Sequence, residues 1–273
     1  MLKACLNGGR SRDDHPAVPV TPAELAADAA RCAALGVAAV HVHPRDASGA
    51  ESLRPAVIAD ALTAIRAAQP GLPVGVSTGA WIEPDPADRV AAVRAWSVLP
   101  DFASVNAHEP GAEAVAAALH ERGVLVEVGL WTLDAVTAYQ GWRVPVGRIL
   151  VECMAEEVPV ALADAGRILA ATAVGEATSA AGPPVLLHAE GPATWAVLAE
   201  AVSRGLHTRI GMEDTFLLPD GARASGNAAL VTAALGHVRA GGVGDGHRGI
   251  RFDVRRRLGW DRSGRCRVGL ARR

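Results

Sequence analysis

Short apolar runs alternate with longer alanine-rich segments along most of the chain. Each run is rich in valine, isoleucine or leucine and is bounded by glycine, proline or polar residues, which is the pattern of buried strands. The strands predicted in this way cover residues 3–7, 37–43, 73–78, 101–106, 124–129, 148–152, 184–190 and 207–213. Their regular recurrence predicts an α/β fold.

The segments between these runs carry helix start signals, namely a proline near the first helical position or a Ser, Thr or Asp cap. The expected starts are Thr21–Pro22, Arg54–Pro55, Pro84–Asp85, Pro110–Gly111, Thr132, Ala155, Pro192 and Ser225. Eight strand–helix units in about 240 residues fit a (β/α)8 TIM barrel. A doubly wound open sheet is the competing architecture, but it normally has a glycine-rich first turn. We therefore predict one barrel domain over residues 1–242 and a basic C-terminal extension over residues 243–273.

Half of the 273 residues are apolar and only 4% are aromatic, which suits a large aliphatic core. No apolar stretch is long and uncharged enough to span a membrane, and the N-terminal residues do not resemble a signal peptide, so we expect a cytoplasmic protein. The cysteines, Cys5, Cys32, Cys153 and Cys266, are far apart and include no CxxC pair. We expect them to be reduced and mostly buried.

The net charge of −2 hides an asymmetry, because ten arginines and two aspartates follow from His247 onward. A basic tail can bind nucleic acid or phosphate groups. A solvated C-terminal arm is the favoured interpretation, since the tail has no aromatic spacing and no known nucleic-acid motif. We assign no function to it and do not expect nucleic acid as a partner.

Several enzyme classes lack their required residues. Lys3 is the only lysine in the chain. Schiff-base and pyridoxal-phosphate chemistry need a lysine in the pocket, so both are disfavoured. No GxGxxG follows a strand and no GxxxxGK[ST] is present, so dinucleotide and P-loop sites have no support.

The stretch AVHVHPRD places two histidines at the end of the second predicted strand. Because side chains alternate along a strand, His41 and His43 point to the same face, and Pro44 ends the strand just after them. Such a pair is a metal-ligand geometry, or else a hydrogen-bonded pair in the core. The carboxyl end of a barrel strand is where active sites lie, which favours the metal.

Polar residues also end the other predicted strands. Read in order, these are Asn7, Ser77, Thr78, Ser104, Asn106, Glu127, Glu152, His188, Glu190, Arg209 and Glu213. Several have plain structural alternatives. Glu127 could be a buried salt-bridge member, Ser77 to Gly79 a simple turn, and His188 a packed histidine at the rim.

Alternation along the last strand places Arg209, Gly211 and Glu213 on one face. If that face looks into the barrel mouth, Glu213 can complete a metal site with the two histidines. Two histidines and one carboxylate form a known catalytic zinc set, and also an iron oxygenase set. Asp214, just past the strand, is free to pair with Arg209 or to act as a base. Alternatively, Glu213 and Asp214 cap the next segment or pair with Arg223.

Five motifs, in order along the chain, carry a resemblance to a known family. They are NGGRSRDDHPAVPVTPAEL, HVHPRD, VGVSTG, ASVN and RIGMEDTFLLPDG. Together they resemble the β-keto acid cleavage enzyme family, typified by 3-keto-5-aminohexanoate cleavage enzyme. The resemblance extends to about Gly236 and does not include the arginine-rich tail.

The resemblance implies a zinc-dependent acyltransferase on a (β/α)8 barrel, usually a homotetramer. A β-keto acid reacts with acetyl-CoA as cosubstrate to give acetoacetate and a new acyl-CoA. The family's ligands to one zinc ion per chain match His41, His43 and Glu213. Its Arg–Asp pair, which removes the C2 proton, matches Arg209 and Asp214, and the supporting glutamate matches Glu127. Its substrate-carboxylate contacts match Ser77, Thr78, Gly79, Ser104 and Asn106.

The chain departs from the family pattern near the mouth. Arg10 stands where well-known members have a glutamate, and Ala107 to Pro110 replace the usual Gly-Ser turn. These loops shape the pocket for the far end of the substrate.

Two rival functions remain. The first is a zinc amidohydrolase-type hydrolase that uses His41, His43, His188 and Asp214 around an activated water. That family's histidine pair normally ends the first strand, whereas here it ends the second. The second is a basic-tailed binding protein on an inactive barrel, which would lack the complete metal and Arg–Asp sets.

Overall fold

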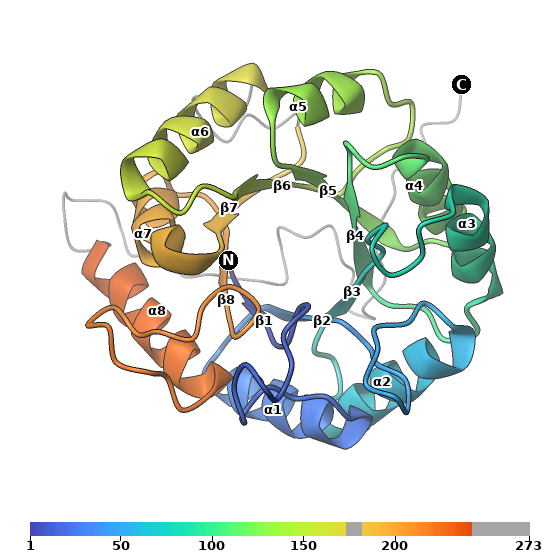
Figure 1. Cartoon of the computed structure of the whole chain (residues 1–273), viewed down its shortest axis with the longest axis horizontal. Coiled ribbons are helices and arrows are strands. Elements are labelled where there is room, and N and C mark those ends of the chain that lie inside the picture. Colours follow the sequence, from blue (N-terminus) through green and yellow to red (C-terminus); the bar gives the residue numbers. More distant parts are fainter. Residues whose placement is uncertain (173–181, 242–273) are drawn as a thin grey trace.

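Eight parallel strands form the inner ring of the structure, a computed structural model that describes residues 1–172 and 182–241 (Figure 1). The strands are β1 (Leu2–Cys5), β2 (Ala39–Val42), β3 (Val74–Ser77), β4 (Phe102–Asn106), β5 (Leu125–Leu130), β6 (Arg148–Cys153), β7 (Val185–Ala189) and β8 (Thr208–Ile210). Each strand pairs in parallel with its neighbour from β1 to β7, and β1 also pairs with β8. An isolated bridge between Leu186 and His207 joins the two ends of the sheet. The predicted TIM barrel is therefore confirmed.

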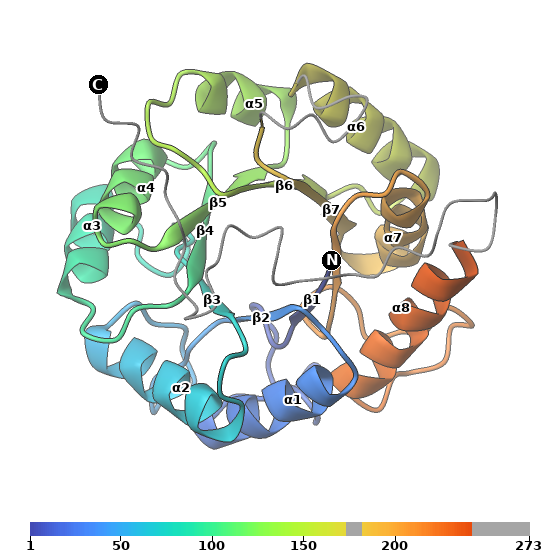
Figure 2. The ribbon, with the colours of Figure 1, turned by 180° about the vertical axis from the view of Figure 1, so that it is seen from behind.

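The helices surround this ring, as both faces of the barrel show (Figures 1 and 2). They are α1 (Pro22–Ala34), α2 (Pro55–Ala68), α3 (Pro86–Ala95), α4 (Ala112–Glu121), α5 (Leu133–Gln140), α6 (Val158–Ala171), α7 (Thr194–Ser203) and α8 (Asn227–Gly241), with a short 3-10 helix, η1 (Gly191–Ala193), before α7. Five helices start where the sequence predicts. Thr21, Asp85 and Thr132 cap α1, α3 and α5 through their side chains.

Three predicted helix starts differ from the structure. The α6 helix begins at Val158 rather than near Ala155, because Pro159 lies in its first turn and fixes the start there. The start predicted at Pro192 belongs to the 3-10 helix that precedes α7. The start predicted at Ser225 is displaced to Asn227.

The last strand is shorter than predicted. The β8 strand ends at Ile210, and the backbone N–H groups of Asp214 and Thr215 both donate to the carbonyl of Gly211, at 2.9 and 3.1 Å. Residues 211–215 are therefore a turn. Glu213 enters the barrel mouth from this turn and not by alternation along a strand. The predicted strand geometry of residue 213 is therefore wrong, although its side chain lies beside the two histidines as predicted.

Alternate residues of each strand face the helices and the barrel interior. The outward residues, such as Val40, Val76 and Val126, belong to the aliphatic core between strands and helices. Inside the barrel, the Phe102 ring lies under the Lys3 ammonium, whose Nζ is 5.2 Å from the ring centroid. Gly75 makes room for this ring, because a Cβ there would come within 1.9 Å of Phe102 Cε2.

The structure also bears on the expectations about the cysteines, membrane spans and the C-terminal extension. Cys5, Cys32 and Cys153 are buried and free, as predicted, whereas Cys266 lies outside the described residues. None of the helices in the described part of the chain has the length and apolarity needed to cross a membrane. The predicted basic extension, residues 243–273, also lies outside the described residues.

We predict that Gly75→Ala destabilises the protein by about 1–3 kcal/mol, because the added methyl group overpacks the barrel interior against Phe102. Urea denaturation measures the change. Gly166→Ala is the matched control, since a Cβ at this α6 position meets no atom within 4 Å. It should stabilise by about 0.5–1 kcal/mol through helix propensity. Equal stabilities of the two variants would contradict the interior packing described here.

Candidate metal centre and active site

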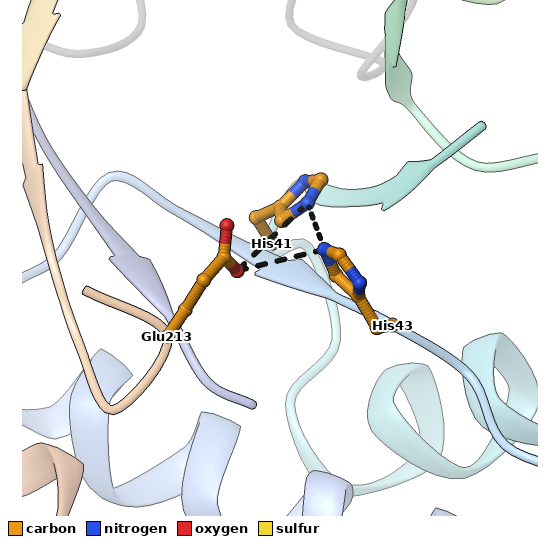
Figure 3. A group of neighbouring side chains, drawn as sticks. All are labelled: His41, His43 and Glu213. Carbon is orange, nitrogen blue, oxygen red and sulfur yellow. Dashed lines mark hydrogen bonds and ion pairs between the residues drawn. The ribbon is translucent and has the colours of Figure 1, made fainter. Parts of the chain in front are cut away.

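Three side chains converge inside the carboxyl end of the barrel (Figure 3). His41 Nε2 and His43 Nε2 are 3.1 Å apart. Glu213 Oε2 lies 3.7 Å from His43 Nε2 and 4.0 Å from His41 Nε2. All three residues are buried. The structure therefore brings together the set that the sequence analysis picked as metal ligands.

His43 is fixed by contacts on both its backbone and its ring. The Asn7 side chain donates to the His43 carbonyl at 2.8 Å and accepts from its N–H at 2.9 Å. On the far side of the ring, Nδ1 pairs with the Glu51 carboxylate, which also accepts from Trp81 Nε1 at 3.1 Å. A carboxylate bonded to Nδ1 leaves Nε2 as the ligand atom, which is the usual arrangement at metal-binding histidines.

Glu213 reaches this centre only because Gly8, which lies against it in space, has no side chain. Gly8 has a φ of +51°, and a Cβ there would lie 2.4 Å from Glu213 Cγ. Both the conformation and the close approach require glycine. The NGG stretch after β1 thus makes space for the Glu213 carboxylate of the candidate metal site.

The charge state of the centre fits a cation. Burial, together with the His43 and Lys3 charges, lowers the pKa of His41 well below its usual value, so its imidazole is neutral. Neutral imidazole is the form that binds metals. Glu213 Oε2 is buried and has no hydrogen-bond partner within the described ranges. A buried carboxylate oxygen aimed at two imidazole nitrogens is the donor set of a divalent metal ion.

Arg209 and Asp214 form a buried ion pair beside this centre. Arg209 Nη2 is 2.7 Å from Asp214 Oδ1, and Arg209 Nε donates to the same oxygen at 3.0 Å. Burial raises the pKa of Asp214, assisted by the Glu213 and Glu190 charges, whereas Arg209 lowers it. Asp214 Oδ2 has no hydrogen-bond partner among the described residues. The pair therefore offers a carboxylate with one free oxygen and with basicity above that of an ordinary aspartate.

Glu127 does not join the Arg209–Asp214 pair, contrary to the role that the resemblance implies. It is fully buried lower in the barrel, where it forms ion pairs with Lys3, at 2.6 Å, and with Arg148. These two cations lower the pKa of the carboxyl group against the effect of burial. The structural alternative, a buried salt bridge, is the one that the contacts support.

Two other glutamates approach Arg209 instead. Glu152, from the end of β6, and Glu190, just after β7, each have an oxygen 3.9 Å from Arg209 Nη2. The sequence placed both at strand ends but gave neither a role. Glu51 was missed, because it lies in the loop after β2 and no periodic pattern marks it.

The predicted substrate-binding residues lie at the ends of β3 and β4, and some of their polar groups are already engaged. Ser77 Oγ accepts from the Gly79 N–H at 3.2 Å, and Thr78 Oγ1 donates to the Ser104 carbonyl at 2.7 Å. Asn106 Nδ2 donates to Glu109 at 2.8 Å. These contacts fix the loops without excluding a ligand, since a hydroxyl or an amide can form further hydrogen bonds.

Arg10 lies at the mouth, as its position in the first loop suggested. Its Nε donates to the Glu213 carbonyl at 3.3 Å, and its Nη2 is 3.5 Å from Glu190. His188, the third histidine of the rival hydrolase site, is not part of the ligand group that His41, His43 and Glu213 form within the described residues.

We predict that Glu127→Gln lowers the free energy of unfolding by about 3–5 kcal/mol, because it leaves two buried cations without a counterion. Urea denaturation again measures the change. The control is Glu121→Gln, whose exposed pair with Arg94 should be worth less than about 0.5 kcal/mol. A loss in Glu127→Gln as small as the control's would argue against a structural role.

Known proteins resemble this chain both in sequence and in fold. A profile of the family BKACE, beta-keto acid cleavage enzyme, matches residues 1–243. Among solved structures, the ternary complex of ObcA with a C4-CoA adduct and oxalate has 16% identity and a TM-score of 0.64, covering 82% of this chain and 63% of that chain. The binary complex of ObcA with oxaloacetate has 16% identity and a TM-score of 0.64, covering 84% and 64%. An N-acetylmannosamine-6-phosphate 2-epimerase from Clostridium perfringens has 14% identity and a TM-score of 0.51, covering 78% and 87%.

The structural matches establish the fold, and the family match establishes the family. The chain spans less than two thirds of the length of the ObcA chains, and at such identities the likeness shows the shared barrel alone. The family profile, in contrast, matches residues 1–243, a range that includes all eight strands of the barrel. On this evidence the chain belongs to the beta-keto acid cleavage enzyme family and is an enzyme.

Proposed function

We propose that this protein is a zinc-dependent β-keto acid cleavage enzyme that converts a β-keto acid and acetyl-CoA into acetoacetate and a new acyl-CoA. The observation that carries the proposal is the pairing of two sites at one barrel mouth. The ligand set of His41, His43 and Glu213 lies directly beside the Arg209–Asp214 pair. Glu213 belongs to both sites, since its Oε2 faces the histidines and its Oε1 is 2.9 Å from Arg209 Nη2.

The residues divide the first step between them. Bound zinc would supply a Lewis acid that polarises the keto group of the substrate and makes its C2 proton more acidic. The free Oδ2 of Asp214 accepts that proton, and Arg209 holds the carboxylate in place and lowers its pKa against the effect of burial. Asp214 is then a neutral acid, and the negative charge has passed to the substrate.

The remaining steps return that proton. The C2 carbanion attacks the acetyl carbonyl carbon, and the CoA thiolate leaves as the new carbon–carbon bond forms. The thiolate then attacks the original keto carbon, the bond from this carbon to C2 breaks, and C2 recovers the proton from Asp214. Acetoacetate and the new acyl-CoA result, with no net change at the protein. No lysine is needed, and the only one, Lys3, is paired with Glu127.

The ObcA structures support this reaction class by analogy. ObcA binds a C4-CoA adduct together with oxalate, and it also binds oxaloacetate, a keto acid. A barrel of this kind thus accommodates a CoA adduct and a keto acid. Active sites of such barrels lie at the carboxyl ends of the strands, where this chain carries its converging residues. The rival hydrolase has no comparable support, because His188 lies outside the ligand group.

The substrate carboxylate is proposed to bind at the ends of β3 and β4. Ser77, Thr78 and Gly79 supply hydroxyl and backbone N–H groups there, and Ser104 and Asn106 lie on the neighbouring strand. Donors of this type bind carboxylates well. A homotetramer, the assembly expected from the family, completes the proposal and is measured by light scattering.

We predict that Asp214→Asn abolishes acetoacetate formation while the protein keeps its metal. The assay uses zinc-loaded protein, labelled acetyl-CoA and a panel of β-keto acids that differ in chain length and terminal charge. The amide cannot accept the C2 proton, so the rate should fall at least about 100-fold. Labelled acetoacetate from the variant at the wild-type rate would exclude Asp214 as the base. No labelled product from wild-type protein with any panel member would overturn the proposed function.

We also predict that Glu51→Gln weakens zinc binding about 10- to 100-fold, because the neutral amide no longer orients the His43 ring as the carboxylate does. Competition with a chelating dye measures the affinity. Glu83→Gln, which changes an acidic residue of the neighbouring β3–α3 loop, should bind zinc like the wild type. Unchanged affinity in Glu51→Gln would show that the Glu51 contact does not support the metal centre.

A further inference from the structure

Glu152 and His188 lie side by side inside the carboxyl end of the barrel and take no part in the steps above. They face each other in the register of β6 and β7. Glu152 Oε2 is 3.6 Å from His188 Nε2, and both side chains are buried. Burial lowers the pKa of His188 well below its usual value, so its ring is neutral, and within residues 1–172 and 182–241 the cation that approaches Glu152 is Arg209. A buried acidic group whose one cationic neighbour is Arg209 points to a function there.

Arg209 is surrounded by carboxylates on two sides. Asp214 and Glu213 approach its Nη2 at 2.7 and 2.9 Å, and both come from the turn after β8. Glu152 and Glu190 approach the same nitrogen at 3.9 Å from the ends of β6 and β7. A single guanidinium therefore has two carboxylates in direct contact and two more about 1 Å farther away.

The proposed reaction takes away the close counterions. Asp214 becomes neutral when it accepts the C2 proton, and the Glu213 charge is shared with the metal. Arg209 cannot lose its own charge, because a guanidinium does not deprotonate in proteins. A buried cation without a counterion is strongly destabilised and would move. Another carboxylate must then hold Arg209 in place.

We propose that Glu152 is the positioning residue that holds Arg209 while Asp214 carries the proton. This inference rests on the proposed function. Glu190 is less suited to the task, because its side chain is 32% exposed and lies 3.5 Å from Arg10. The side chain of Glu152 is only 8% exposed, and its field is correspondingly less screened.

The protonation behaviour of Glu152 is compatible with this task. Burial raises its pKa to about 7, with Glu190 and Glu213 acting in the same direction and Arg209 and Lys3 opposing them. The carboxylate form is therefore accessible at neutral pH. Removing a negative charge from this cluster favours the ionised form further.

The kinetic test uses Glu152→Gln and exchange of the C2 protons of acetoacetate in D2O, followed by NMR. This exchange isolates the proton-transfer step from the chemistry of CoA. Zinc-loaded Glu152→Gln should lose about 100-fold in the saturated exchange rate, the size of effect that a misplaced group causes, with little change in KM or zinc content. Glu152→Asp, which keeps the charge, should recover most of the rate.

Glu156→Gln is the matched control, since this exposed residue lies in the connection between β6 and α6 and should exchange at the wild-type rate. Wild-type exchange in Glu152→Gln would overturn the inference. Equal loss in Glu152→Gln and Glu152→Asp would also overturn it, because the charge would then be irrelevant.

A structural test needs no activity. Asp214→Asn imitates the protonated aspartate, so in its crystal structure Arg209 Nη2 should close from 3.9 Å to about 3 Å from Glu152. In the double variant Asp214→Asn/Glu152→Gln, Arg209 should leave this position. An Arg209 that stays in place in the double variant contradicts the inference. If variants with Glu152→Gln do not fold, an Arg209 that keeps its 3.9 Å distance from Glu152 in Asp214→Asn alone also contradicts it. If wild-type protein forms no acetoacetate, the proposed function fails, while these two structures still decide whether Glu152 holds Arg209.

Discussion

The whole active site depends on how one buried guanidinium is compensated. Arg209 lies inside the barrel with four carboxylates around its Nη2, two within 2.9 Å and two at 3.9 Å. Water cannot screen these charges there, so each change in one carboxylate alters the forces on the others. A metal ion beside Glu213 would supply the positive charge that this cluster lacks. The proposed metal binding and the proposed role of Asp214 as a base would then depend on the same charge balance.

A second cluster of charged side chains lies deeper in the barrel than Arg209, and its ion pairs stabilise the fold. Glu127 lies opposite Arg148 in the β5–β6 register and also pairs with Lys3 from β1. Glu152 follows Arg148 by four residues on the same strand, which is a rise of roughly 13 Å at about 3.3 Å per residue. The charge of Glu127 is neutralised by Lys3 and Arg148, whereas the carboxylates around Arg209 face the barrel mouth. The same residue types thus act as a structural layer below and as a reactive layer above.

The sequence predicted the barrel and the histidine pair, because alternation along a strand fixes which face a side chain takes. It also predicted the Glu213 carboxylate, although this side chain enters the mouth from a turn and not by alternation. It could not predict depth inside the barrel, which depends on the register between strands. The family resemblance matches Glu127 to the glutamate that supports the Arg209–Asp214 pair, whereas in the structure its register partner is Arg148. Glu51 could not be found at all, since it meets His43 through the fold of a loop and not through any periodic pattern.

Glu213 explains why a metal site and a base of this kind can work together. One carboxylate oxygen faces the two histidines and the other contacts Arg209, so a metal that draws on Glu213 weakens its attraction for the guanidinium. Arg209 is then freer to stabilise Asp214 and the negative charge that forms on the substrate. Because both oxygens belong to one carboxylate, Glu213 couples the candidate ligand site to Arg209. The turn after β8, for which Gly8 just after the neighbouring β1 strand makes room, therefore sets the spacing between the candidate ligand site and the proposed proton acceptor.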